Sequence, residues 1–171
     1  MLFNAVKKKA LRKAVEGTKL PSVPLEFNYQ VKTIGILSEK KEQSTVESMI
    51  NILVDRGFKR EDILVLYYDG SNSKVKEEDA YVFKLRDFES SLKTSNESLK
   101  VFVEKPFDLL ISFYKSDTIP LLWGTSQSKA KFKVGLASVT SFVNHFNIEM
   151  NGLDAELYVK LLFEYINIFK N

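Results

Sequence analysis

The stretch "VKTIGILSEKKEQSTVESMINILVDRGFKREDILVLYY", residues 31–68, decides the predicted fold. It opens with "VKTIGILS" (31–38), a β-branched and apolar run that is typical of a strand. "STVESMINILVDRG" (44–57) follows with apolar residues at helical spacing. "DILVLYY" (62–68) is nearly continuous in apolar residues, as expected for a strand covered on both faces. Because a strand, a helix and a strand in this order form a right-handed crossover, we predict two parallel neighbouring strands.

The helix within this stretch has recognisable ends. Ser44 and Glu47 have the spacing of a capping box, in which each side chain binds the backbone amide of the other residue. Gly57 is suited to the left-handed conformation that ends a helix. Between these ends, the apolar residues share one face: Val46, Met49, Ile50, Leu53 and Val54.

The rest of the chain continues the alternation. "FDLLISFY" (107–114) is a central-strand run, and "DTIPLLWGTSQSK" (117–129) begins a helix with Pro120 in its first turn. The remaining predicted elements are a polar loop at 69–79, an edge strand at 80–88 with Tyr81, Phe83 and Leu85 on one face, a short helix at 96–105, strands at 131–136 and 146–150, and a terminal helix at 153–169.

These elements predict an α/β fold, a three-layer Rossmann-like domain with a mainly parallel sheet. We assign it to residues 28–171, with the strand order 3-2-1-4-5. A basic helix and a proline-containing linker, residues 1–27, precede it. With 171 residues and 44% hydrophobic residues, the chain is long enough for one such core.

The segment "SKAKFKVGL" (128–136) has two interpretations. Alternating lysines around an aromatic residue would suit nucleic acid, whereas a period of two after a helix is typical of a parallel strand. We favour the strand, with Phe132 and Val134 on one face. Lys129, Lys131 and Lys133 are then either the exposed edge of this strand or the tail of the preceding helix. Gly135 then marks a turn or a close approach to a neighbour.

The N-terminal helix is basic. Residues 1–20 hold six basic residues against one acidic residue, although the net charge of the whole chain is only +3. Phe3, Val6, Ala10 and Ala14 share one side, with Leu11 and Val15 at its flank and Lys7 inside it. This segment is either an electrostatic tether or a solvated helix. The residues predicted to bind an anionic partner are Lys7, Lys8, Lys9, Arg12 and Lys13.

The C-terminal helix is apolar over about 240° of its circumference. One face of a sheet does not need so wide an arc. Either this helix packs under both the sheet and the N-terminal helix, or part of its surface is the interface of a homodimer.

Motifs for catalysis are missing from the sequence. There is no cysteine, no glycine-rich phosphate loop, and no metal-ligand cluster around His145, which is the only histidine. The carboxylates Glu39, Asp69 and Asp117 follow predicted strands without a diagnostic spacing. We therefore predict no cofactor and no metal and assign no catalytic residue; whether the protein is an enzyme stays open, and we favour a protein that is not. Open α/β sheets bind ligands at the carboxyl ends of their strands, which gives a predicted ligand site at Ser38, Glu39, Tyr114, Lys115 and Ser116.

The order of "FDLLISFY", "SKAKFKVGL" and "FNIEM" resembles an uncharacterised family of small bacterial proteins, a domain of unknown function found mostly in Bacteroidota. The basic helix and "VKTIGIL" fit this resemblance, which implies no activity. About 30 residues, from the strand with Asp108 near its start to "KFKVG", also resemble the N-terminal half of heptosyltransferase-type glycosyltransferases. Those enzymes carry a Gly-Asp motif after the first strand, whereas "ILSEKKEQ" has none.

We expect a cytoplasmic protein, because no signal peptide or run of about 18 apolar residues occurs. The preferred hypothesis is a non-catalytic binding protein whose basic arm contacts RNA or a ribonucleoprotein. The alternatives are a degenerate glycosyltransferase-like or small-ligand-binding domain, and peripheral membrane association through the N-terminal helix.

Overall fold

The computed structural model describes residues 1–24, 27–71 and 81–169. In the described residues, six parallel strands form one sheet in the order β3-β2-β1-β4-β5-β6. The strands are β1 (Ile34–Glu39), β2 (Ile63–Tyr68), β3 (Val82–Phe83), β4 (Leu109–Phe113), β5 (Phe132–Leu136) and β6 (Phe146–Ile148). The predicted fold class and strand order are confirmed, and β6 extends the sheet beyond β5. Most of the predicted loop at 69–79 and residue 80 lie outside the described residues.

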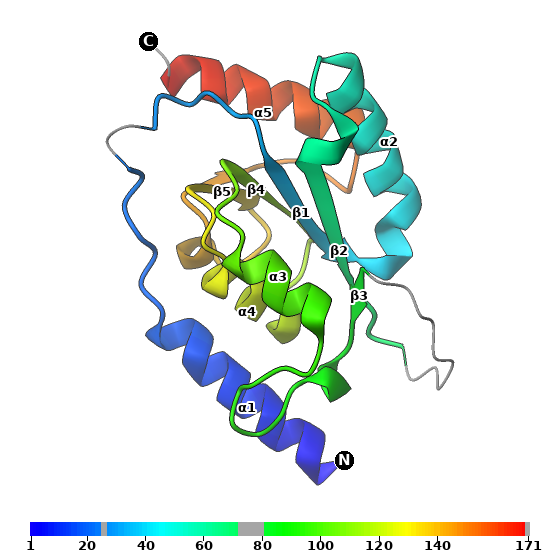
Figure 1. Cartoon of the computed structure of the whole chain (residues 1–171), viewed down its shortest axis with the longest axis vertical. Helices are drawn as coiled ribbons and strands as arrows, with labels where there is room; N and C mark the ends of the chain where they lie inside the picture. The colour runs from blue at the N-terminus through cyan, green and yellow to red at the C-terminus, as the bar shows by residue number, and fades with distance from the viewer. Residues whose placement is uncertain (25–26, 72–80, 170–171) are drawn as a thin grey trace.

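Helices cover both faces of the sheet, which gives the three predicted layers (Figure 1). Ile34 and Ile36 of β1 belong to the core on one face, and Leu37 belongs to the core on the other. The helices are α1 (Leu2–Gly17), α2 (Gln43–Asp55), α3 (Glu97–Glu104), α4 (Ile119–Gln127) and α5 (Ala155–Phe169). The first core contains α2 and α5, and the second contains α1, α3 and α4.

Of the two predicted helix ends of α2, the structure confirms one and contradicts the other. Gly57 has a φ of 99°, so the predicted left-handed end of the helix is confirmed. The predicted capping box at Ser44 and Glu47 is wrong. A 3-10 turn, Lys40–Glu42, leads directly into α2, which begins at Gln43 without a side-chain cap.

The predicted edge strand at 80–88 is much shorter than expected. β3 covers only Val82–Phe83, and a 3-10 turn, Leu85–Asp87, follows it. The amide of Lys84 donates to the Asp87 carboxylate at 2.8 Å, which turns the chain away from β2. The chain therefore leaves the sheet edge after two paired residues.

Helix α1 is docked rather than free. Leu11 and Val15 are buried in the core that contains α4, and Lys7 is buried one turn before them. The Lys7 ammonium donates to the carbonyl oxygen of Arg86 at 3.4 Å. The predicted apolar side is therefore wrong in part, since Phe3 and Val6 are 69% and 53% exposed. The face that meets the body is the one carrying Leu11 and Val15.

Strand β5 explains the segment "SKAKFKVGL". Phe132 and Val134 lie in the core on the α2 and α5 face, as predicted. Gly135 is the predicted close approach, because a Cβ atom there would lie 2.2 Å from Nδ2 of Asn144. Lys129 and Lys131 are exposed and pair with carboxylates of Glu104 and Asp108.

The third lysine of this segment is not exposed, so that prediction is wrong. Lys133 is 0% exposed, and its ammonium donates to the carbonyl oxygens of Thr125 at 2.8 Å and Ser126 at 3.4 Å. These carbonyls lie in the last turn of α4, the negative end of its dipole. The apolar stem of a lysine is compatible with burial when its ammonium finds such acceptors. The alternation of lysines and apolar residues along the strand does not predict the burial of Lys133.

The buried ammonium of Lys133 should make the free energy of unfolding depend on pH. We expect the variant Lys133→Met to lose that dependence. Burial lowers the pKa of Lys133 from 10.5 to about 8. Between these values the unfolded chain binds more protons than the folded chain, so stability rises with pH. From about pH 7.5 to about pH 9.5, this group contributes a rise of about 2 kcal/mol. Urea denaturation at both pH values measures it. Lys59→Met, at an exposed position, should keep the rise; the same rise in Lys133→Met would contradict the assignment.

Candidate functional site

Two residues of the predicted ligand site face the protein interior. Ser38 is buried at the end of β1, and its hydroxyl donates to the carbonyl oxygen of Phe113 at 2.7 Å. Tyr114 is also buried, and its hydroxyl lies 2.7 Å from Oγ1 of Thr125. Burial raises the pKa of Tyr114, so it stays protonated. Both side chains join β1 and β4 to their neighbours and do not reach the surface.

The other three residues of that prediction lie at the surface. Glu39 pairs with Lys41 at 2.5 Å and accepts a hydrogen bond from the hydroxyl of Thr118 at 3.3 Å. Lys115 and Ser116 are exposed after β4. Glu39 and Thr118 therefore meet across the carboxyl ends of β1 and β4, where a ligand was predicted.

The hollow nearest to Glu39 lies one strand further along, between the ends of β1 and β2. It has a volume of about 300 Å³, and it adjoins a second hollow of about 250 Å³ beside β3. We call the two together the carboxyl-edge groove. Both hollows are lined by Tyr68, Asp69, Gly70 and Ser71; the first is completed by Glu39, Lys40 and Lys41, and the second by Asn4, Lys8, Lys84, Leu85 and Arg86.

The carboxylates of this groove are neutralised by neighbouring lysines. Asp69 pairs with Lys84 at 2.7 Å, and both side chains are 11% exposed. Burial opposes ionisation of Asp69, but hydrogen bonds from Lys84 and Ser71 overcome it and lower its pKa to about 2. Burial, together with the charges of Asp69 and Glu39, raises the pKa of Tyr68, which keeps its phenol as a donor. The groove can thus offer lysine, arginine and phenol donors to an anion.

Sequence reasoning missed most of this groove. Asp69 was noted as a carboxylate at a strand end, but its partner Lys84 lies beyond β3, in a segment predicted to be a regular strand. Arg86 comes from the turn that replaces the end of that strand. Only the alternating "FKLRD" pattern, with two cations near a predicted sheet edge, hinted at them.

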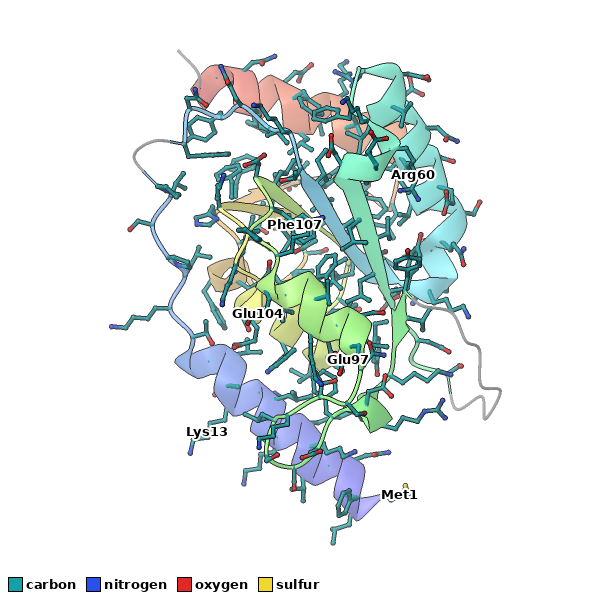
Figure 2. All side chains as sticks on the ribbon, in the orientation of Figure 1. Met1, Lys13, Arg60, Glu97, Glu104 and Phe107 are labelled. Carbon is teal, nitrogen blue, oxygen red and sulfur yellow. The ribbon has the colours of Figure 1, made fainter. Side chains whose placement is uncertain are left out.

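A basic surface adjoins the groove on α1. Lys8, Lys9, Arg12 and Lys13 are exposed, and none forms an ion pair with a carboxylate in the described part of the chain. Figure 2 shows Lys13 projecting away from the body of the molecule. Lys8 also lines the groove, so the two features are continuous. Of the five basic residues predicted to act together, Lys7 alone is buried against the body.

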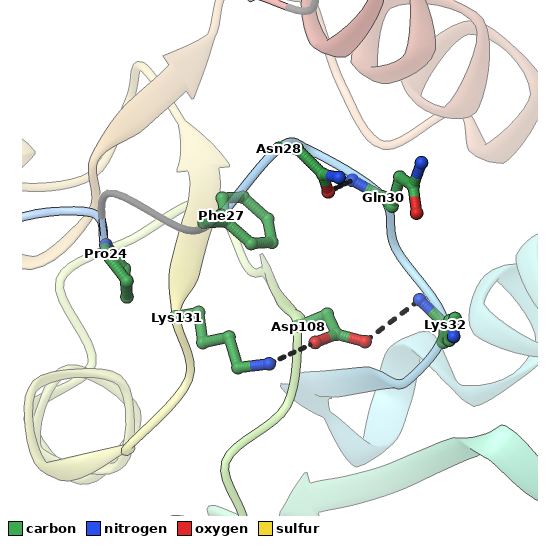
Figure 3. Close-up of a pocket in the computed structure, with 7 residues that line it drawn as sticks. All are labelled: Pro24, Phe27, Asn28, Gln30, Lys32, Asp108 and Lys131. Carbon is green, nitrogen blue, oxygen red and sulfur yellow. Dashed lines mark hydrogen bonds and ion pairs between the residues drawn. The ribbon is translucent and has the colours of Figure 1, made fainter.

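A third hollow, of about 370 Å³, lies at the amino ends of the strands, opposite the carboxyl-edge groove (Figure 3). Its centre is Asp108, which accepts from the amides of Lys32 and Thr33 at 3.0 Å each and from Lys131 at 2.7 Å. Burial opposes its ionisation, but these donors lower the pKa of Asp108. Asp108 therefore joins the amino ends of β1, β4 and β5, and its donors leave it little capacity to bind a ligand.

His145 makes structural contacts. Its Nδ1 accepts from the amide of Lys133 at 2.9 Å, and its Nε2 lies 2.7 Å from the carbonyl oxygen of Pro21. Because a carbonyl only accepts, Nε2 carries the proton and the ring is neutral. Burial lowers the pKa of His145, which favours that state. No group of three or more metal-binding side chains occurs in residues 1–24, 27–71 and 81–169.

The sequence model of a family of unknown function, DUF6913, matches residues 4–169. The chain belongs to this family. The predicted resemblance to an uncharacterised family is thereby confirmed, and membership brings no activity with it. The origin in Bacteroidota and the likeness to heptosyltransferases stay predictions. No curated protein and no solved structure matches this family member. No helix within the described residues has the length and apolar character needed to cross a membrane.

Proposed function

We propose that the protein is a non-catalytic binding protein that holds RNA, alone or within a ribonucleoprotein, on the basic surface of α1. The observation that carries this proposal is the set of four exposed cations on a docked helix. Lys9 lies three residues before Arg12 and four before Lys13, so it is one helical turn away from both. Each cation can neutralise a backbone phosphate and release its counterions.

Docking of α1 strengthens this proposal. Leu11 and Val15 fix the helix against α4, and the hydroxyl of Thr18 accepts from the Gln127 amide at 2.9 Å. A free arm would lose conformational entropy on binding, whereas a fixed helix presents its charges in a set geometry. The carboxyl-edge groove extends this surface through Lys8 and Arg86. We further propose that residues 1–27 act as a binding segment of the 28–171 domain, in the cytoplasm.

We expect the variant Lys9→Gln/Arg12→Gln/Lys13→Gln to lose RNA affinity by about tenfold or more, because three phosphate contacts disappear. The slope of log affinity against log salt should fall by about 2 for a single strand. Fluorescence anisotropy of a labelled single-stranded RNA, measured from about 50 to 200 mM salt, provides both values.

A control with the same loss of charge is Lys59→Gln/Lys93→Gln/Lys100→Gln, at exposed positions outside α1. It should keep most of the affinity and most of the salt slope. Equal losses in both triple variants would mean that only net charge matters, and would overturn the assignment to α1. Binding of anionic vesicles but not RNA would replace this proposal with the membrane alternative, which the exposed tip Met1, Leu2, Phe3 and Val6 favours.

A second candidate function is the binding of a small anionic ligand in the carboxyl-edge groove. It rests on the position of the groove at the carboxyl ends of the strands and on donors such as Tyr68, Lys84 and Arg86. Inorganic phosphate or UDP-glucose at ten times its dissociation constant should raise Tm by about 3–6 °C. The shift should shrink in Arg86→Gln and persist in Lys93→Gln; unchanged melting with both compounds would count against the glycosyltransferase-like hypothesis.

A further inference from the structure

Most of the wide apolar arc of α5 is covered within the chain. Tyr158 and Leu162 lie in the sheet core, which they share with α2. Phe163 packs against Phe58 at 5.6 Å, and Tyr165 packs against Phe146 at 4.4 Å between ring centroids. Helix α1 covers none of it, because α1 belongs to the core on the other face of the sheet. The predicted packing of α5 under the N-terminal helix is therefore wrong.

One apolar stripe of α5 remains open to solvent. Leu157 is 41% exposed and Ile168 is 66% exposed, with the half-buried Leu161 between them. Spacings of four and seven residues put all three side chains on one face of the helix. Lys160 and Glu164 are exposed along one flank of this stripe, and neither pairs with an opposite charge among the described residues.

We propose that this stripe binds a second copy of the chain, with the two α5 helices antiparallel about a two-fold axis. The axis passes midway between positions 162 and 163, so that Leu157 meets Ile168 of the partner subunit. Lys160 then lies within about 1.5 Å, along the helix axis, of Glu164 of the partner subunit. A two-fold axis keeps the charged flanks of both helices on the same side, so this ion pair forms twice.

The charge pattern decides between orientations. In a parallel pair with two-fold symmetry, the charged flanks of the two copies lie on opposite sides of the interface, so Lys160 and Glu164 do not meet the partner's opposite charge. The antiparallel arrangement instead brings the two flanks together, and its nearest charged pair, Lys160 with Glu164 of the partner subunit, is attractive. The occupant that matches both the apolar stripe and its charged flank is therefore the stripe itself.

The small extent of the stripe sets the expected affinity. Two exposed side chains and one half-buried side chain form an interface at the low end of the range for specific association. We expect a dissociation constant of roughly micromolar, so that monomer and dimer exchange with concentration. This inference is independent of RNA binding, because α1 and α5 lie at opposite ends of the molecule (Figure 1).

Sedimentation velocity of the full chain, over about 1 to 200 µM, tests the apolar contact. Leu157→Gln/Ile168→Gln should remain monomeric at concentrations where the unmodified protein is mostly dimeric. Val6→Gln, at an exposed apolar position on α1, is the matched control and should dimerise normally. A monomer at every concentration, or a dimer that the double variant leaves unchanged, would overturn the proposal.

Charge reversal tests the register. Lys160→Glu alone and Glu164→Lys alone should each weaken the dimer by about tenfold, because two attractive pairs become repulsive. The double variant Lys160→Glu/Glu164→Lys restores opposite charges across the axis and should recover the original dissociation constant. Additive weakening in the double variant would exclude the antiparallel register, and circular dichroism of each variant checks that it is folded.

Discussion

Leu11→Ala should lower the free energy of unfolding by about 3 kcal/mol, although Leu11 lies in a segment that composition alone marks as a basic arm. The side chain is 0% exposed in the core that contains α4. Removing its branched end takes buried apolar area out of the core and leaves a cavity that a helix fixed on one side cannot fully close. Urea denaturation, with fluorescence of Trp123 as the probe, measures the change; Trp123 lies in the same core.

The control for this prediction is Leu2→Ala, at a position that is 85% exposed on the same helix. Its effect should stay within about 0.5 kcal/mol. If Leu11→Ala lowered the free energy of unfolding by less than about 1 kcal/mol, α1 would not be docked and would act as a free tether. The comparison matters for function, since a docked helix presents its lysines and arginine in one orientation.

Gly135→Ala should also destabilise the protein, by about 2–3 kcal/mol. The added Cβ would lie 2.2 Å from Nδ2 and 3.0 Å from Cγ of Asn144, and 3.1 Å from Oδ1 of Asn147. Asn144 is buried, and its amide donates to Asn147 at 3.1 Å. Relief of the clash therefore requires β5 to move or this hydrogen bond to break.

Gly17→Ala is the matched control, because nothing lies within 4 Å of a Cβ there and the φ is ordinary. This variant should be neutral or slightly stabilising, since alanine narrows the unfolded ensemble. Thermal and urea unfolding of both variants separates the two cases. Equal free energies of unfolding for the two variants would show that residues 144–147 can move aside without loss of stability. This result would contradict the close approach at Gly135.

The sequence was sufficient for the sheet because its central strands carry redundant information. β1, β2 and β4 are apolar on both faces, and the segments between them have helical spacing or a Pro at a helix start, so parallel pairing and order followed from general rules. Lys133 shows what the periodicity of a sequence does not predict. Period two predicted an exposed lysine, but its fate depends on the carbonyls of α4, which only the packed structure brings to it.

The candidate site was harder to predict for the same reason. Ser38 and Tyr114 were located correctly at strand ends, but the direction of a side chain at a strand end depends on where the next turn goes. The groove depends on Asp69 and Lys84, which meet only because β3 is two residues long and turns away at Asp87. No local pattern gives that length. Charge was more predictable than shape, since the exposed cations of α1 were recognised from composition.

The contacts that hold the N-terminal segment come from far along the chain. Gln127 contacts Thr18 across 109 positions, and His145 contacts Pro21 across 124. During synthesis on the ribosome, helix α1 therefore emerges well before α4 and these two residues exist. Its core contacts wait for α4 and Gln127, and the Pro21 contact waits for His145, so this segment docks long after it has been made. Throughout that interval its cations lie beside the nascent chain and the ribosome, and a pulse-labelled nascent chain should show α1 accessible to protease until residue 127 has left the exit tunnel.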